Sequence, residues 1–184
     1  MATARITQNS LLMQNLMEFY NKGDNLERML SIINGDSSIS LRIVDWFATN
    51  FAKQYYVTYA TENQARFKVY VDYKLNLRAY SKRRFDPFCR WERISIPYGT
   101  NGEYIQTTIG QLNFFKWALE NQVIKYIQEH YSEIEADMNS RNSTSKRRKT
   151  SGPANKTRKK REELSISASK TIHREEVEIV VKFN

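Results

Sequence analysis

The sequence predicts an α+β domain that is followed by a basic tail. Apolar residues recur every three or four positions in parts of 12–55 and throughout 107–138, which is typical of amphipathic helices. From 67 to 79 every second residue is apolar, which is typical of a half-buried strand. From Asn139 the composition changes to Asn, Ser, Thr, Lys and Arg, which cannot bury enough apolar surface to fold. We therefore expect three parts: an α+β domain (1–138), a disordered basic linker (139–163) and a C-terminal strand segment (164–184).

The composition limits the possible protein classes. A chain of 184 residues with 40% hydrophobic and 12% aromatic residues suits one domain with a real core. Its one cysteine, Cys89, cannot form an intramolecular disulfide and fits a reducing compartment. Two histidines and one cysteine are too few for an ordinary zinc site, so we expect no metal and no cofactor. The N-terminus lacks a signal-peptide pattern and no apolar run could span a membrane, so we expect a soluble intracellular protein.

The first 55 residues predict three helices. Two short helical patterns, at 12–19 and 26–33, are separated by the turn-like sequence Asn-Lys-Gly-Asp-Asn. Gly35 is expected to end the second helix, and the Asp-Ser-Ser that follows offers an N-cap for the third. The third helix, at about 41–55, has one apolar face, which we expect to pack against 107–138.

The middle of the chain predicts a small antiparallel sheet. The alternating segment 67–79 is interpreted as a strand, although its length exceeds that of most strands and leaves room for a bend or a helical end near Leu75. A second strand is predicted at 93–98, where Ile94 and Ile96 alternate with polar residues, and 57–59 can pair as a third.

The segment 107–138 predicts one long core helix. Thr108 followed by Gln111 forms a capping-box pattern at its start. Thirty residues at about 1.5 Å rise would give a helix of about 45 Å, enough to cross a small domain. A coiled-coil seam is the alternative, but Trp117 and Tyr126 widen the apolar face beyond such a seam. The predicted core stripe consists of Leu112, Phe115, Leu119, Val123, Ile127, Tyr131, Ile134 and Met138.

The net charge of +9 is concentrated in the tail. Residues 139–161 contain ten Lys and Arg and no acid, which leaves 19 basic against 20 acidic residues elsewhere. Outside the tail, 66–93 holds nine basic and three acidic residues, whereas 94–138 holds two basic and six acidic ones. We therefore expect a polarised domain with a basic β face and an acidic helix face.

Basic and aromatic residues alternate in the predicted loop 81–93. This mixture suits nucleic acid, because cations neutralise phosphate and exposed rings stack on unpaired bases. The alternative is that Phe85, Phe88 and Trp91 fill the core and the cations are merely solvated. Cys89 is interpreted as an inert cysteine, because no histidine is near it in sequence. The candidate nucleic-acid-binding residues here are Lys82, Arg83, Arg84, Arg90 and Arg93, with Phe85 and Trp91 as candidates for stacking.

The tail contains two basic clusters and ends in an alternating segment. The clusters fit a two-part nuclear import signal, a polyanion-binding arm or a solubilising tail. From Val177 to Phe183 apolar residues alternate with others, which predicts a strand that completes the domain's own sheet or adds to a partner's sheet. The candidate binding residues of the tail are Lys146, Arg147, Arg148, Lys149, Arg158, Lys159, Lys160 and Arg161.

Several segments together resemble a known but uncharacterised protein family of the nucleocytoplasmic large DNA viruses. The resemblance covers roughly 30–184 and implies a viral protein that works in gene expression, genome handling or the virion. It implies a location in the host nucleus, the cytoplasmic viral factory or the virion, and it supplies no catalytic residue. The segments that carry it are 33–47, 79–90, 107–115, 165–170 and 177–183.

An enzyme is the least favoured class. The sequence has no glycine-rich phosphate loop and no histidine paired with a nucleophile. We expect a non-enzymatic protein whose partner is DNA or RNA, with a viral protein as a further candidate partner, and with no membrane and no small-molecule substrate. The alternative is a virion structural or assembly protein that docks through its C-terminal strand and its acidic helix face.

Overall fold

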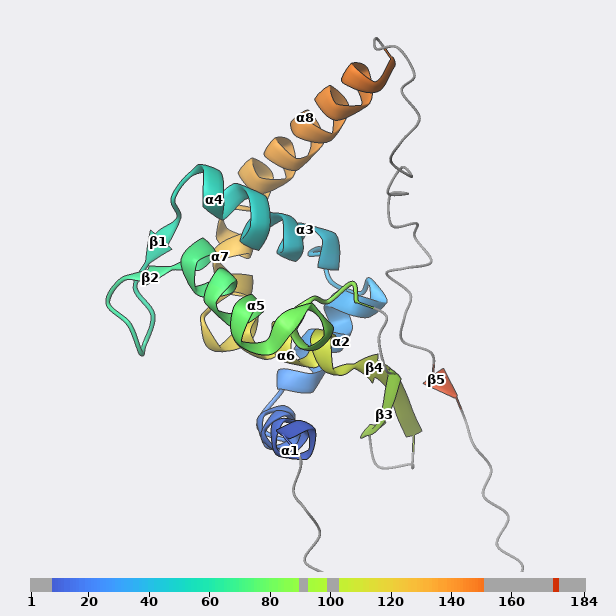
Figure 1. Ribbon diagram of the computed structural model, residues 1–184. Coiled ribbons are helices and arrows are strands. Elements are labelled where there is room, and N and C mark those ends of the chain that lie inside the picture. Colours follow the sequence, from blue (N-terminus) through green and yellow to red (C-terminus); the bar gives the residue numbers. More distant parts are fainter. Residues whose placement is uncertain (1–7, 90–92, 99–102, 151–173, 176–184) are drawn as a thin grey trace, which may run out of the picture.

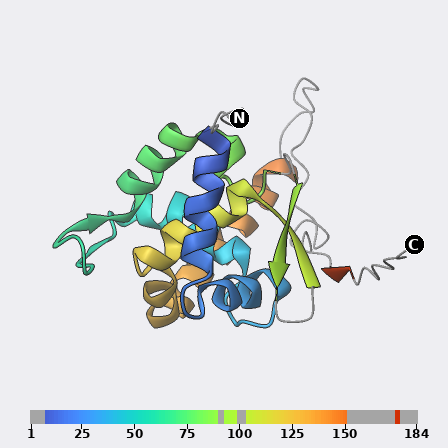
Figure 2. The ribbon, with the colours of Figure 1, turned by 90° about the horizontal axis from the view of Figure 1, so that it is seen from below.

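The computed structural model describes residues 8–89, 93–98, 103–150 and 174–175. The predicted α+β class is confirmed: helices form the body, and two small antiparallel sheets lie at opposite ends of it (Figures 1 and 2). The elements are α1 (Gln8–Tyr20), α2 (Asn25–Asn34), α3 (Leu41–Trp46), the π-helix η1 (Phe47–Phe51), α4 (Ala52–Gln54), β1 (Thr58–Tyr59), β2 (Phe67–Lys68), α5 (Val69–Phe85), β3 (Arg93–Tyr98), β4 (Glu103–Thr108), α6 (Ile109–Glu120), α7 (Val123–Glu129), α8 (Tyr131–Thr150) and β5 (Arg174–Glu175).

The N-terminal helices begin and end where the sequence indicates. Gly35 follows α2 with φ 84°, a left-handed conformation that favours glycine, and its N–H donates to the carbonyl of Ser31. The Ser40 hydroxyl accepts a hydrogen bond from the backbone N–H of Ile43 at 3.3 Å and caps α3. The predicted third helix is the continuous run of α3, η1 and α4, which packs against α7 and α8 as expected.

The predicted long helix is wrong as a single element, although its core stripe is confirmed. The segment forms α6, α7 and α8, with breaks at Gln122, which has φ 56°, and at His130. The Asn121 side chain donates to the carbonyl of Trp117 at 2.9 Å and helps to end α6. These breaks turn α7 and α8 against α3 and η1, where one straight helix would leave the body. All stripe residues are buried except the half-buried Tyr131.

The predicted strand at 67–79 is also wrong, because only its first two residues are extended and the remainder belongs to α5. An apolar residue at every second position is also an apolar residue at every fourth position. Val69, Tyr73 and Leu77 therefore share one helix face, which packs against α6. Val71 and Leu75, which a strand would have buried, are 51% and 57% exposed.

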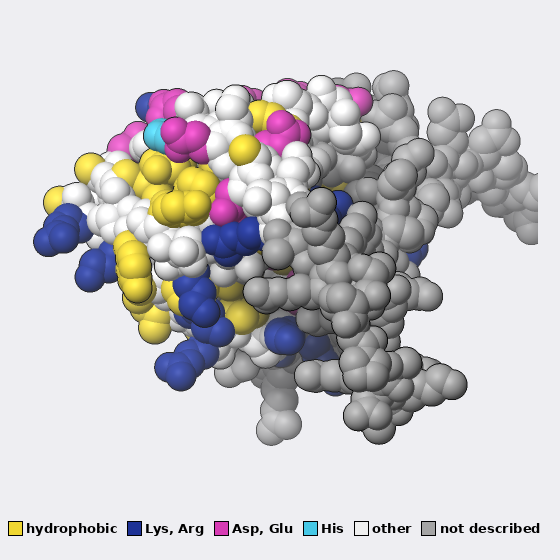
Figure 3. Space-filling model, turned by 90° about the horizontal axis from the view of Figure 1, so that it is seen from above, with side chains coloured by type: hydrophobic (Ala, Val, Ile, Leu, Met, Phe, Trp, Pro, Cys, Tyr) yellow, Lys and Arg dark blue, Asp and Glu magenta, His cyan; other side chains and the backbone are white. Residues whose placement is uncertain are grey.

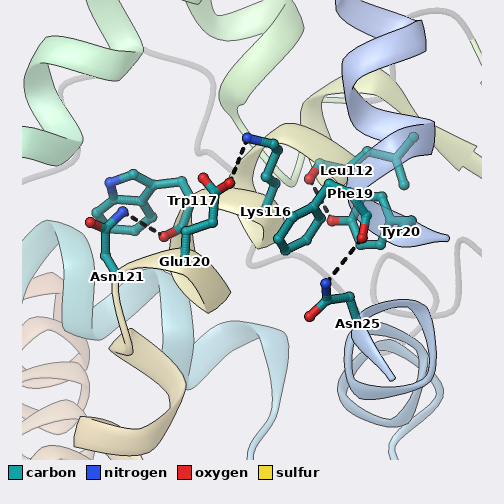
Figure 4. A network of polar contacts seen from close by, with 8 residues as sticks. All are labelled: Phe19, Tyr20, Asn25, Leu112, Lys116, Trp117, Glu120 and Asn121. Atoms are coloured by element: carbon teal, nitrogen blue, oxygen red, sulfur yellow. Dashed lines mark hydrogen bonds and ion pairs between the residues drawn. The ribbon is translucent and has the colours of Figure 1, made fainter. Parts of the chain in front are cut away.

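The helix α6 is the centre of the core, and α1 lies across it (Figure 2). The Tyr20 hydroxyl at the end of α1 donates to the carbonyl of Leu112 at 2.6 Å, as Figure 4 shows. Near it, Lys116 forms an ion pair with Glu120 at 2.7 Å and lies 5.3 Å from the centre of the Phe19 ring. These contacts fix the N-terminal helix against the central one.

The two sheets differ from the single sheet that we predicted. The strand at 93–98 is confirmed as β3, but its neighbour is β4, which pairs Arg93 with Thr108 and the buried Ile96 with the buried Ile105. The predicted strand at 57–59 supplies β1, which pairs with β2 in a separate sheet. Thr108 ends β4 and caps α6, since its hydroxyl accepts from the N–H of Gln111 at 3.1 Å.

The C-terminal part is described only in pieces. Helix α8 continues to Thr150 and projects from the body (Figure 1), whereas we expected an irregular chain from Asn139. The predicted strand at 177–183 lies outside the described residues. Just before it, β5 pairs with β4 in the chain's own sheet. No helix in the described part of the chain combines the length and the apolarity that a membrane span requires.

Candidate nucleic-acid interface

Three of the predicted binding residues, Lys82, Arg83 and Arg84, form the last turn of α5. A kink precedes them at Ser81, whose φ of 66° and ψ of 165° interrupt the helix. A positive φ is uncommon for a residue with a side chain. Lys82 and Arg83 are exposed and Arg84 is half-buried, so the kink places three cations in one turn at the surface.

Phe85 follows the kink by four residues, and its side chain is fully buried, with 0% exposed. Its ring centre lies 5.8 Å from that of Tyr73 and 5.9 Å from those of Phe114 and Trp117. The prediction that Phe85 could stack on a base is therefore wrong. The alternative, that this ring fills the core, is confirmed.

The end of α5 is held by the first turn of α6. Gly110 lies so close that a Cβ atom on it would be 2.7 Å from the carbonyl oxygen of Asp86 and 3.3 Å from that of Arg83. The Asn113 side chain donates to the carbonyl of Arg84 at 3.0 Å. The backbone that carries the three cations is therefore fixed by packing and by a hydrogen bond.

The remaining predicted residues fall into three groups. Arg93 is exposed on β3 and pairs with Thr108, the cap of α6, so it lies near the start of α6, which the end of α5 also contacts. The residues 146–149 belong to the projecting part of α8, where only the backbone is described. Outside the described residues lie Arg90, Trp91, Arg158, Lys159, Lys160 and Arg161.

The basic surface continues along α5, which the strand predicted at 67–79 did not indicate. Lys74 and Arg78 are exposed and lie four residues apart, about one helical turn, and Lys82 follows beyond the kink. We use the name α5 face for five exposed residues of this helix: Val71, Lys74, Leu75 and Arg78 before the kink, and Lys82 directly after it. The four-residue spacing of its cations was visible in the sequence, but the interpretation as a strand concealed it.

The positive charge of α5 is poorly compensated within the helix. The helix contains five Lys and Arg and one acid, Asp72. The Asp72 Oδ1 accepts hydrogen bonds from Trp117 Nε1 at 2.7 Å and from Asn76 Nδ2 at 2.9 Å, so this carboxylate is engaged on the side of α6. Among the described residues, neither Lys74 nor Arg78 forms an ion pair with a carboxylate. The α5 face therefore attracts anions.

Acidic residues gather on a different side of the molecule. In Figure 3, Lys and Arg occupy the left and lower parts of the view, Asp and Glu lie mainly along the upper edge, and hydrophobic side chains lie between them. Burial, followed by the charges of Glu133 and Glu129, raises the pKa of Tyr126 on α7. The predicted polarity exists, but the prediction of a basic β face is wrong, because that charge lies largely on a helix.

A half-buried carboxyl group, that of Asp45 on α3, interacts with the charge of Asp86 at the end of α5. Burial, and secondly the charge of Asp86, raises the pKa of Asp45 on α3 from 3.8 to about 7. Burial and then the charges of Asp45 and Asp86 raise the pKa of Tyr73. In the described part of the chain, no group of three or more His, Cys, Asp or Glu side chains could hold a metal ion. Cys89, near this end of α5, is half-buried.

Comparisons with known proteins confirm the viral resemblance. A family model described as "Family of unknown function (DUF7197)" matches residues 3–181. The chain is similar to "Uncharacterized protein L507" of Acanthamoeba polyphaga mimivirus, with 41% identity over 128 residues. The matched part is 66% of this chain and 49% of the mimivirus protein, so the match spans about half of that relative. No solved structure matches the chain.

Proposed function

Given that this chain belongs to the family of unknown function DUF7197, we propose from its own surface that it is a non-enzymatic viral nucleic-acid-associated protein. It acts in viral gene expression or genome handling, in the nucleus or the viral factory of the infected cell. The α5 face, together with the basic clusters at 146–149 and 158–161, binds the phosphate backbone of DNA or RNA. No membrane, cofactor or small-molecule substrate takes part.

The observation that carries this proposal is the uncompensated charge of α5. The single carboxylate of this helix is bound to Trp117 and Asn76. Among the described residues, Lys74, Arg78 and Lys82 form no ion pair with a carboxylate, so they remain available for phosphate, and the release of counterions favours binding. The exposed Val71 and Leu75 lie among them and offer apolar contact as well.

The α5 face and the tail have different tasks in this proposal. The α5 face is built on a helix packed against α6, so its cations keep fixed positions and can set the register of a bound strand. The tail clusters follow the core in sequence and raise the local concentration of nucleic acid at the α5 face. Removing the tail charges should therefore lower the affinity for all nucleic acids by a similar factor.

The test neutralises the α5 face and compares it with a matched control. The triple variant Lys74→Gln, Arg78→Gln, Lys82→Gln should bind a labelled oligonucleotide on the order of tenfold less tightly and lower the salt slope by about 2, or about 0.7 per single-strand phosphate contact. The control Arg28→Gln, Arg42→Gln, Lys125→Gln removes the same charge from exposed positions elsewhere and should bind nearly as the parent does. Equal losses in both variants would refute the α5 face as the site.

A role in virion assembly is the second candidate, favoured by the position of β5. Tyr104 and Ile105 of β4 pair with Glu175 and Arg174, so the edge of β4 accepts a strand that follows the basic tail. In an assembly, the same edge would take the strand of another copy or of a partner. Sedimentation at increasing salt separates the two functions, because strand addition persists at high salt whereas phosphate contacts do not.

A further inference from the structure

Tyr56, which the sequence analysis did not single out, is exposed in a strained position. Its side chain is 87% exposed, and it follows the end of α4 with φ 50°, in the left-handed region. Helices commonly end with a residue in this conformation, but the residue is usually glycine, since a Cβ atom makes it costly. No ring contact of Tyr56 is found among the described residues. Within the described part of the chain, the Tyr56 ring therefore does not pack against another aromatic ring.

The backbone that carries Tyr56 is firmly held. The N–H of Val57 donates to the carbonyl of Ala52 at 3.2 Å, and the carbonyl of Val57 accepts from the N–H of Val69 at 3.3 Å. The carbonyl of Tyr56 itself accepts from the Thr58 hydroxyl at 3.1 Å. Because Val57 is buried, the ring stands on a fixed base, and a ligand that contacts it immobilises little backbone.

Two lysines lie close to Tyr56 in the chain and in the β1–β2 pairing. Lys68 on β2 is directly opposite Thr58, two residues from Tyr56. Lys53, three residues before Tyr56, is exposed, and its Nζ lies 5.6 Å from the centre of the Tyr70 ring at the start of α5. Val57, the residue after Tyr56, is hydrogen-bonded to Val69, the first residue of α5. Tyr56 therefore lies near the start of the helix that carries the α5 face.

A rigid exposed ring beside cations suits one class of ligand. Unpaired bases stack on aromatic side chains while Lys and Arg neutralise the phosphates, whereas the bases of a duplex are already stacked on each other. An anionic membrane or an acidic protein would use the cations but would not need a ring held in a costly conformation. We propose that Tyr56, with Lys53 and Lys68 beside it, is a base-stacking site for single-stranded nucleic acid. This inference rests on the proposed function and names its substrate class.

The test compares Tyr56→Gly and Tyr56→Phe with the parent in the full-length chain, using labelled oligothymidylate and the same strand in a duplex. Glycine suits the left-handed backbone, so Tyr56→Gly should melt at or above the temperature of the parent. It should bind the single strand about 5- to 150-fold less tightly, the loss expected for one base stack, and bind the duplex unchanged. Tyr56→Phe should retain the affinity of the parent.

Two further measurements make the result specific. Tyr104→Ala removes another exposed tyrosine, on β4 in the other sheet, and should leave single-strand binding unchanged. Light-induced crosslinking of an iodouridine-containing strand should label Tyr56, as identified by mass spectrometry.

The outcomes separate this inference from the proposed function. If Tyr56→Gly binds the single strand as the parent does while neutralisation of the α5 face abolishes binding, the stacking site is refuted and the proposed function stands. If Tyr56→Gly weakens single strand and duplex equally, stacking is also refuted. If the parent binds neither nucleic acid, both proposals fall.

Discussion

Helices α5 and α6 pack against each other but differ in their surroundings. Nearly every side chain of α6 is buried, including the polar Gln111 and Asn113. In α5 only Val69, Tyr73 and Phe85 are fully buried, and cations cover much of the remainder. A helix that is buried on all sides serves the fold, whereas a helix with one free side can carry function on that side. In the proposed function, this pair of helices therefore separates stability from binding.

The largest effect should come from the centre of α6. Replacing the fully buried Leu112 by Ala should lower the free energy of unfolding by about 2 to 5 kcal/mol, because the lost side chain leaves a cavity. Replacing the exposed Leu75 of α5 by Ala is the matched control and should change it by about 0.5 kcal/mol or less. Urea unfolding of both variants measures the contrast. Equal losses of stability in the two variants would mean that α6 does not contribute more to stability than the exposed side of α5.

The two helices also differ in how well the sequence predicts them, because they differ in burial. The core stripe of α6 and its Thr108 cap were predictable, because burial and capping leave periodic and local signals. The nature of α5 was not, because Val69, Tyr73 and Leu77 fit both a strand and a helix. In the structure this segment is a helix that packs against α6 and is joined to it by the hydrogen bond between Asp72 and Trp117.

Other features depend on contacts that no local pattern reveals. The helix break at Gln122 is indicated in the sequence only by the preceding Asn121, whose side chain bonds to the end of α6. The buried Phe85 follows a kink at Ser81 that no sequence pattern indicates. The exposure of Tyr56 depends on where α4 ends. The predicted cations Lys82 and Arg83 do lie at the surface, because charged side chains are rarely buried whatever element carries them.

The second prediction concerns how stability depends on pH through Asp45 on α3. The pKa of Asp45 is about 7 in the folded state, above its ordinary value of 3.8, because of burial and of Asp86. The folded state thus retains a proton that the unfolded state releases, so stability should fall as pH rises from about 4 to about 7 and then level off. Asp45→Asn has no such charge and should be more stable than the parent at about pH 8, by up to a few kcal/mol.

Urea unfolding at about pH 4 and about pH 8 checks this expectation. The two proteins should differ little at the lower pH, where Asp45 is protonated in the parent. Asp36→Asn, at an exposed position in the loop after α2, is the control and should follow the parent at both values. An Asp45→Asn variant that is less stable than the parent at pH 8 would show that the carboxylate has favourable partners.

The last prediction concerns Asp72, whose side chain links α5 to α6 by a hydrogen bond. Its carboxylate accepts from Trp117 of α6 and is also the single negative charge of α5. Asp72→Asn keeps an oxygen acceptor but loses the charge-assisted part of the hydrogen bond, so the free energy of unfolding should fall by about 1 kcal/mol. The net charge of α5 rises at the same time, so affinity for nucleic acid should increase. The exposed Glu62→Gln makes the same change of charge and should leave stability within about 0.5 kcal/mol. Melting and oligonucleotide binding should therefore move in opposite directions in Asp72→Asn. A variant that loses both would show that the α5 face requires this contact with α6, and that the two helices act as one unit.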